Sequence, residues 1–217
     1  MNTNMNNIFF TYFMDFMVND WFASVPITIC SVLTVAFIFE RYFYYQKNRR
    51  DVTAFIHQLQ RELESGQLQK AQATCSRLGG VIGEVAEEGV RLLAEQKEDF
   101  SKAFDITIGL VTRKLEKHLP ILGTIGATCP FLGLFGTVVG VIFTLNQLGA
   151  AGGGTPVVVT GVAKALIATG YGLIVAILAV IFNNTYTNIV KGYNDDFALL
   201  KLLFLSFVAS DEPSKVH

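Results

Sequence analysis

Charge is scarce in this sequence. Lysine, arginine, aspartate and glutamate make up 16% of its 217 residues, against about 25% in typical soluble domains, and this indicates a membrane protein. The net charge of −1 gives no electrostatic reason to expect a nucleic-acid partner. The glycine-rich run at residues 149–154 lacks the Lys-Ser/Thr pair that a phosphate-binding loop needs. Because no nucleophile–base pair is recognisable either, we do not expect an enzyme.

Cysteine is sparse as well, and basic residues are missing from the N-terminus. Cys30, Cys75 and Cys129 fit no zinc or redox spacing, so we expect free thiols that pack as small residues, and no metal or cofactor. Residues 1–40 hold no lysine or arginine, which excludes a secretory signal with a basic start. Residues 1–21 are instead predicted to be a periplasmic, interfacial segment.

Long apolar runs predict three transmembrane helices, at residues 22–45, 120–148 and 157–182. Basic residues gather in the segment between the first two runs, and this bias orients the chain. We therefore expect the N-terminus in the periplasm, a cytoplasmic helical domain at 46–119, a periplasmic loop at 149–156 and a cytoplasmic C-terminal helix and tail at 183–217. The last helix of the cytoplasmic domain is expected to run directly into the second span. His57 and His118 in this domain are expected to be solvated or to cap helices.

Small and polar residues form a stripe along each of the last two spans. In the second span the stripe falls at alternating spacings of four and three residues: Gly126, Pro130, Gly133, Thr137, Gly140 and Thr144. In the third span it includes Gly161, Ala165, Gly172 and Ala176. Small residues let helix backbones approach closely in lipid, so both stripes predict helix–helix interfaces. We expect packing and kink roles for Pro130, Gly133, Gly136, Gly140 and Gly172.

Threonine hydroxyls occur near the middle of both spans, at Thr128, Thr137 and Thr169. They can bond a carbonyl of their own helix or line a polar path. The two spans contain no aspartate or glutamate, and the only acid in the first span is Glu40, where Arg41 can pair with it. Because proton relays through membranes usually use carboxylates or histidine, a carboxylate for proton transport would have to come from another chain.

One lysine, Lys164, lies about two turns inside the third span, roughly 10 Å from its outer end at 1.5 Å per residue. Its side chain can extend to the membrane surface, face an aqueous cavity, or pair with an acid of a partner. Lys164 and Thr169 are five residues apart, about 140° around the helix, so they cannot both point directly at one axis.

Two long motifs resemble the ExbB/TolQ/MotA proton-channel family. ATCPFLGLFGTVVGVI at 127–142 resembles the family's second-span pattern, and GVAKALIATGYGLIVAILAVIFNN at 161–184 is similar to its third-span pattern. The three-span layout favours ExbB/TolQ-type subunits over MotA, which has four spans. The family usually has glutamate where this chain has Lys164.

The resemblance implies an all-α membrane protein that forms a ring-shaped homo-oligomer, commonly a pentamer, surrounded by lipid in the bacterial inner membrane. An ExbD/TolR-like single-span partner would supply the ion-binding aspartate, and a TonB-like transducer would receive the energy. The coupling ion would be H⁺ or Na⁺, and Thr137 and Thr169 would line the inner cavity. A stator subunit for motility and a non-conducting membrane scaffold remain alternatives.

Overall fold

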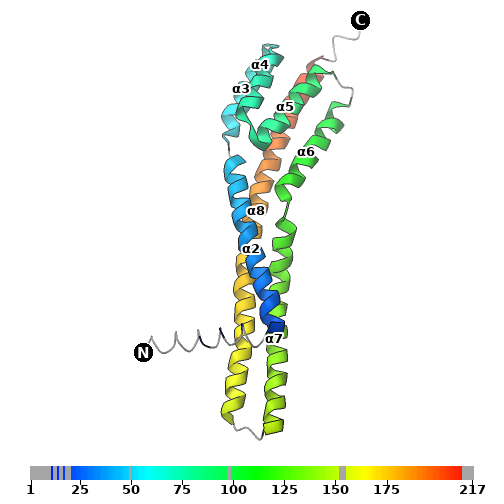
Figure 1. The fold of residues 1–217 in the computed structure, drawn as a ribbon. Coiled ribbons are helices and arrows are strands. Elements are labelled where there is room, and N and C mark those ends of the chain that lie inside the picture. The colour runs from blue at the N-terminus through cyan, green and yellow to red at the C-terminus, as the bar shows by residue number, and fades with distance from the viewer. Residues whose placement is uncertain are drawn as a thin grey trace. The chain divides into compact units, whose positions relative to one another are not determined.

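The computed structural model describes residues 11, 14, 17, 21–48, 50–96, 99–151 and 155–211, and all its regular structure there is helical. The helices of the described residues from Trp21 onward are α2 (Trp21–Asn48), α3 (Val52–Glu64), α4 (Leu68–Leu78), α5 (Gly80–Ala94), α6 (Phe100–Glu116), α7 (Leu119–Ala151) and α8 (Thr155–Asp211) (Figure 1). The all-α prediction is confirmed. The predicted N-terminal segment 1–21 and the end of the tail lie almost entirely outside the described residues.

The chain divides into two compact units. We call residues 1–39 and 118–184 the span unit, and residues 40–117 and 185–217 the helical unit. One end of α2 belongs to the span unit and its other end to the helical unit, and the same is true of α8. Within the described part of the chain, three helices are long and apolar enough to cross a membrane: one begins at Trp21, one covers Leu119–Gly149 and one begins at Val158. Each of the three predicted spans falls on one of them.

In the span unit, α7 and the N-terminal part of α8 lie side by side, and α2 packs against them (Figure 1). Their shared core consists of small and branched apolar side chains: Ala23, Ile27, Ile125, Cys129, Ala168, Val175, Ala176 and Ala179. Four alanines and a cysteine make up five of these eight residues, and such small side chains let the helix axes come close together. Cys30, Cys75 and Cys129 are free thiols, as predicted.

The prediction that the last cytoplasmic helix continues into the second span is wrong. α6 ends at Glu116, Lys117 has extended backbone angles and His118 has φ of 69°. The reason is Pro120, which has no backbone N–H to bond the turn before it but is tolerated in the first turn of a new helix. α7 therefore begins afresh, and the His118 carbonyl caps it by accepting the N–H groups of Ile121 (3.2 Å) and Leu122 (3.3 Å).

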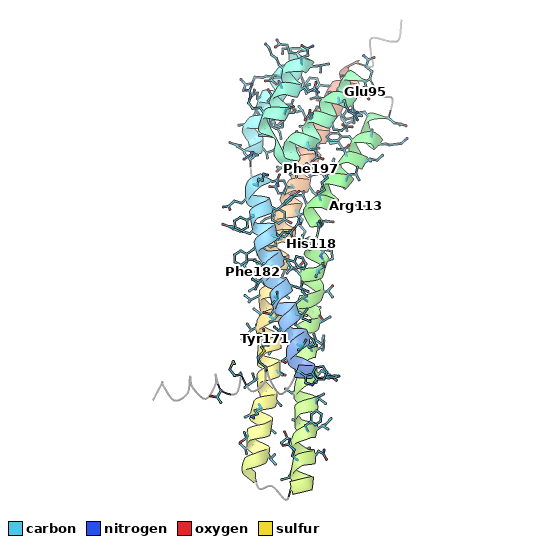
Figure 2. The ribbon with its side chains drawn as sticks, viewed as in Figure 1. Glu95, Arg113, His118, Tyr171, Phe182 and Phe197 are labelled. Atoms are coloured by element: carbon cyan, nitrogen blue, oxygen red, sulfur yellow. The ribbon has the colours of Figure 1, made fainter. Side chains whose placement is uncertain are left out.

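In the helical unit, α3, α4, α5 and α6 pack in sequence against one another. The apolar stripe of α8, whose Phe197 is labelled in Figure 2, completes this core, because Phe197, Leu200 and Phe204 are fully buried. The spacing of the apolar positions 197, 200, 204 and 208 suits packing between subunits, but the structure buries the first three within their own chain. The end of α8 packs against helices of its own chain, since the ring centroids of Phe104 and Phe204 lie 5.5 Å apart.

Candidate functional site

The glycines of α7 face α8 at very short range. A Cβ added to Gly133 would lie 2.9 Å from both the Ala168 carbonyl oxygen and the Thr169 Cα. A Cβ on Gly140 would lie 2.9 Å from the Ala165 Cβ. Real side-chain carbons rarely approach so closely, since carbon atoms in contact prefer about 3.5–4.0 Å. Only glycine fits at these positions with the helices this close.

Two further glycines tighten the same contact. Gly172 of α8 meets α7, because its Cβ would lie 2.7 Å from the Cys129 carbonyl oxygen. Gly136 meets two helices at once: its Cβ would lie 2.8 Å from the Ala168 Cβ and 2.9 Å from the Ala23 Cβ of α2. Pro130 is half-buried inside α7, which the structure assigns as one helix from Leu119 to Ala151. α7 and α8 therefore form a closely packed antiparallel pair, with α2 along one edge.

The two threonines predicted in α7 both bond their own helix. Thr128 Oγ1 donates to the Thr124 carbonyl at 2.8 Å, and Thr137 Oγ1 donates to the Leu134 carbonyl at 2.7 Å. A hydroxyl that donates in this way can still accept a hydrogen bond. The two residues are nine positions apart, about two and a half turns, so they point to opposite sides of α7. The structure does not bring Thr128 together with the other two threonines.

Thr137 and Thr169 do share one edge of the α7–α8 pair. Gly136 and Ala168 face each other across the contact, and each threonine follows one of them by one residue, about 100° around its helix. Because the two helices run antiparallel, this rotation carries both threonines to the same edge. That edge lies away from α2, whose Ala23 meets Gly136 on the other side. Gly133 contacts Thr169, so Thr137 lies about one turn, or about 6 Å, further along.

The Thr169 hydroxyl is the unusual polar atom of this edge. Its Oγ1 is buried, and none of the described residues supplies a hydrogen-bond partner. Leaving a buried hydroxyl unpaired costs about 1–3 kcal/mol. A hydrogen bond from a group that the described residues do not supply would remove this cost.

Lys164 lies on the other edge. It is half-buried, and it precedes Ala168 by four residues, which places it only about 40° from Ala168 around α8. Ala168 faces Gly136 and the α2 side of the pair. Lys164 and Thr169 are thus separated by the α7-facing stripe, as the 140° rotation predicted.

Sequence reasoning missed how α2 holds the end of α6 within the helical unit. Arg41 is buried; its Nη2 donates to Glu40 at 2.8 Å, as predicted, but its Nη1 also donates to the carbonyls of Lys114 (3.2 Å) and Leu115 (3.3 Å). The Tyr45 hydroxyl donates to the same Leu115 carbonyl at 2.7 Å. These carbonyls belong to the last turn of α6, where no helical donor is left for them. The periodicity of neither segment carries a signal of this pairing.

Comparison with known proteins gives a consistent pattern. The model of the MotA/TolQ/ExbB proton channel family matches residues 77–198. Over 91 residues, or 42% of this chain and 39% of the relative, the sequence is 42% identical to the Tol-Pal system protein TolQ of Pseudomonas aeruginosa. It is 47% identical over 77 residues (33% and 51%) to the putative biopolymer transport protein ExbB-like 2 of Helicobacter pylori. It is 28% identical over 196 residues (86% and 59%) to the biopolymer transport protein ExbB of Pseudomonas putida. The chain spans between 39% and 59% of the length of these curated relatives.

Proposed function

We propose that this chain, which belongs to the MotA/TolQ/ExbB proton channel family, is a membrane subunit of an ion-driven motor. Several copies, commonly five, would form a ring in the inner membrane of a double-membraned bacterium, with the N-terminus in the periplasm and the C-terminus in the cytoplasm. The ring would surround the span of an ExbD/TolR-like partner. Ion flow would then energise an envelope process such as TonB-dependent import. The names of its relatives, TolQ and ExbB, support this assignment.

The observation that carries the proposal is the shared edge of Thr137 and Thr169. Two hydroxyls about one turn apart lie on the edge that faces away from α2, and the buried Thr169 hydroxyl has no partner among the described residues. A neutral hydroxyl binds an ion or a protonated carboxyl group weakly. Conduction requires such weak binding, because an ion held too tightly cannot leave.

The absence of acids from α7 and the first part of α8 assigns the proton carrier to the partner. Residues 119–182 contain no aspartate or glutamate, and relays for protons through membranes rely on carboxylates or histidine. In our proposal the partner's aspartate moves along the edge formed by Thr137 and Thr169. The coupling ion is H⁺ or Na⁺, and the chain itself holds no cofactor. Lys164, on the other edge, pairs with or orients an acidic group of a partner chain.

A matched set of isosteric variants tests the proposal. Thr137→Val and Thr169→Val remove hydroxyls from the shared edge and should each lower ion flux by roughly tenfold or more, since one lost hydrogen bond to a charged group is worth about 1.5–3 kcal/mol. Thr128→Val removes a hydroxyl from the opposite side of α7 and should leave flux unchanged. Flux is measured with a pH-sensitive or sodium-sensitive dye in vesicles that carry the chain with its co-purified single-span partner.

Three controls separate the alternatives. The chain alone should carry no gradient-driven current, because it brings no carboxylate. A pull-down from the native membrane should recover a small single-span protein with an aspartate early in its span. If the cellular function survives an uncoupler, the chain is a scaffold. If all three valine variants keep full flux, Thr137 and Thr169 are packing residues only.

A further inference from the structure

The helical unit contains a hollow that the proposed ion path does not use. It has a volume of about 460 Å³ and lies between the C-terminal end of α2 and the middle of α8. This volume falls in the range of ligand pockets, about 300–1,000 Å³. Its lining combines four tyrosines with one base and one acid: Tyr42, Tyr45, Arg50, Tyr186, Tyr193 and Asp196.

The tyrosines form a fixed aromatic wall. The rings of Tyr45 and Tyr186 meet at 5.3 Å with an angle of 48° between their planes. Tyr45, Tyr186 and Tyr193 are each at least nine-tenths buried, and the Tyr45 hydroxyl is anchored to the Leu115 carbonyl. Tyr42 stays half-exposed at the mouth. The faces of tyrosine rings attract ammonium groups, and clusters of such rings are a known way to bind them.

The two charged residues of the lining, Arg50 and Asp196, favour ligand groups of opposite charge. Arg50 Nε donates to the Leu78 carbonyl at 3.2 Å, which holds the guanidinium at the rim of the hollow. Guanidinium groups bind phosphate oxygens well. Asp196 supplies a half-buried carboxylate to the same lining, and a carboxylate complements an ammonium group. The hollow therefore suits a ligand that carries a phosphate and an ammonium group.

The place of the hollow along the helices indicates where that ligand comes from. Tyr45 is the last residue of the predicted first span, and Tyr186 follows the predicted end of the third span by four residues, about 6 Å along a helix. These residues therefore lie at the predicted cytoplasmic membrane surface, where aromatic side chains gather at the level of lipid headgroups.

A helical glycine keeps the hollow open. Gly192 of α8 belongs to the lining, and a Cβ added there would meet no atom within 4 Å. Glycine is unfavourable inside a helix, and no close contact within the chain requires it at this position. A Cβ at residue 192 therefore meets no clash, and a large side chain built on it would take up space at the lining of the hollow.

We propose that this hollow binds the headgroup of a phosphatidylethanolamine molecule from the cytoplasmic leaflet. The ammonium group lies against the half-exposed Tyr42 ring and Asp196, and the phosphate lies against Arg50. The proposal rests on the insertion of the chain in a bilayer, which is part of the proposed function, but not on ion conduction.

Native mass spectrometry of the full chain in detergent, titrated with phosphatidylethanolamine or phosphatidylglycerol of equal chain length, tests the proposal. The wild type should bind phosphatidylethanolamine about tenfold more tightly. Gly192→Phe should lower that affinity at least tenfold. Gly109→Phe is the matched control, because Gly109 lies on α6, outside the hollow lining, and is equally open, with no atom within 4 Å of an added Cβ. Asp196→Asn should abolish the preference between the two lipids, and Arg50→Gln should weaken both.

Three results would overturn the proposal. Equal binding of the two lipids by the wild type would mean that the hollow does not recognise the ammonium group. Equal lipid binding by the two phenylalanine variants, with unchanged helix content by circular dichroism, would place bound lipid elsewhere. A change in the subunit number of Gly192→Phe with unchanged lipid binding would make the hollow a contact between copies. Because the flux of Thr137→Val is measured separately, a failed lipid titration leaves the proposed ion path intact.

Discussion

Replacing Gly172 with alanine tests the close packing of α7 and α8 on which the shared threonine edge depends. The new Cβ would lie 2.7 Å from the Cys129 carbonyl oxygen and 3.1 Å from the Gly133 Cα. Both distances are shorter than the usual contact of about 3.5–4.0 Å by roughly 0.4–1.3 Å, and the atoms concerned are backbone atoms that no rotamer change can move. The helices must shift apart, and overpacking of this kind costs about 1–3 kcal/mol.

Gly170 provides the control, because it is two residues away on α8 and an added Cβ there meets nothing within 4 Å. Alanine gains about 1 kcal/mol of helix propensity over glycine at either position, so the difference between the variants isolates the clash. We expect Gly172→Ala to be less stable than Gly170→Ala by about 1–3 kcal/mol in reversible denaturant unfolding of the full chain in micelles. Equal stability of the two variants would mean that the helices are not in contact at Gly172, and the position of Thr169 beside Gly133 would lose its support.

Three further predictions concern the helical unit. Tyr45→Phe removes one donor from the last turn of α6 and should lower the free energy of unfolding by about 1–2 kcal/mol, while Tyr44→Phe, with no hydroxyl bond described, serves as its control. Burial raises the pKa of the Cys75 thiol to about 12, whereas the thiol of the unfolded chain ionises near 8.5. The contribution of Cys75 to the free energy of unfolding is therefore complete below about pH 8.5 and should fall as pH rises toward 12. Alkaline unfolding curves should show this pH dependence in the wild type, and Cys75→Ala should abolish it. Lys201→Met breaks the 2.7 Å ion pair with Asp105; since Asp105 is more than half exposed, the loss should stay below about 1 kcal/mol, and a larger loss would show that the pair is shielded from water.

The helices could be predicted from the sequence because their signals are local. Uninterrupted apolar runs mark the spans, and apolar residues at intervals of three and four mark the shorter helices. The span predicted at 157–182 and the helix predicted at 183–217 have the same local signals, and the structure joins them in one helix, α8. The break before α7 was missed because the pattern continues on both sides of it, whereas the break depends on a single missing N–H at Pro120. A periodicity averaged over a window does not register one residue.

Tertiary pairing could not be predicted in the same way. The apolar stripe of Phe197, Leu200 and Phe204 predicts that another helix packs against it. The sequence does not say whether that helix belongs to the same chain or to a neighbouring copy. Arg41 was expected only to pair with its neighbour Glu40, yet it also bonds carbonyls more than 70 positions away along the chain. Both cases depend on which helices meet, and no local pattern contains that information.

In the candidate site too, the features set by a single helix could be predicted and those set by helix pairing could not. Helical geometry alone separates Lys164 from Thr169, but it does not say which of Thr128 and Thr137 shares a side with Thr169. That choice requires the register of the antiparallel pair, in which Gly136 faces Ala168 and Gly133 faces Thr169. The register is set by glycines, because only they permit contacts of 2.8–2.9 Å to a hypothetical Cβ. The small residues that appeared to serve packing alone therefore also decide which hydroxyls can act together, and a change at Gly136, which contacts Ala168 and Ala23 but no threonine, should disturb the proposed ion path.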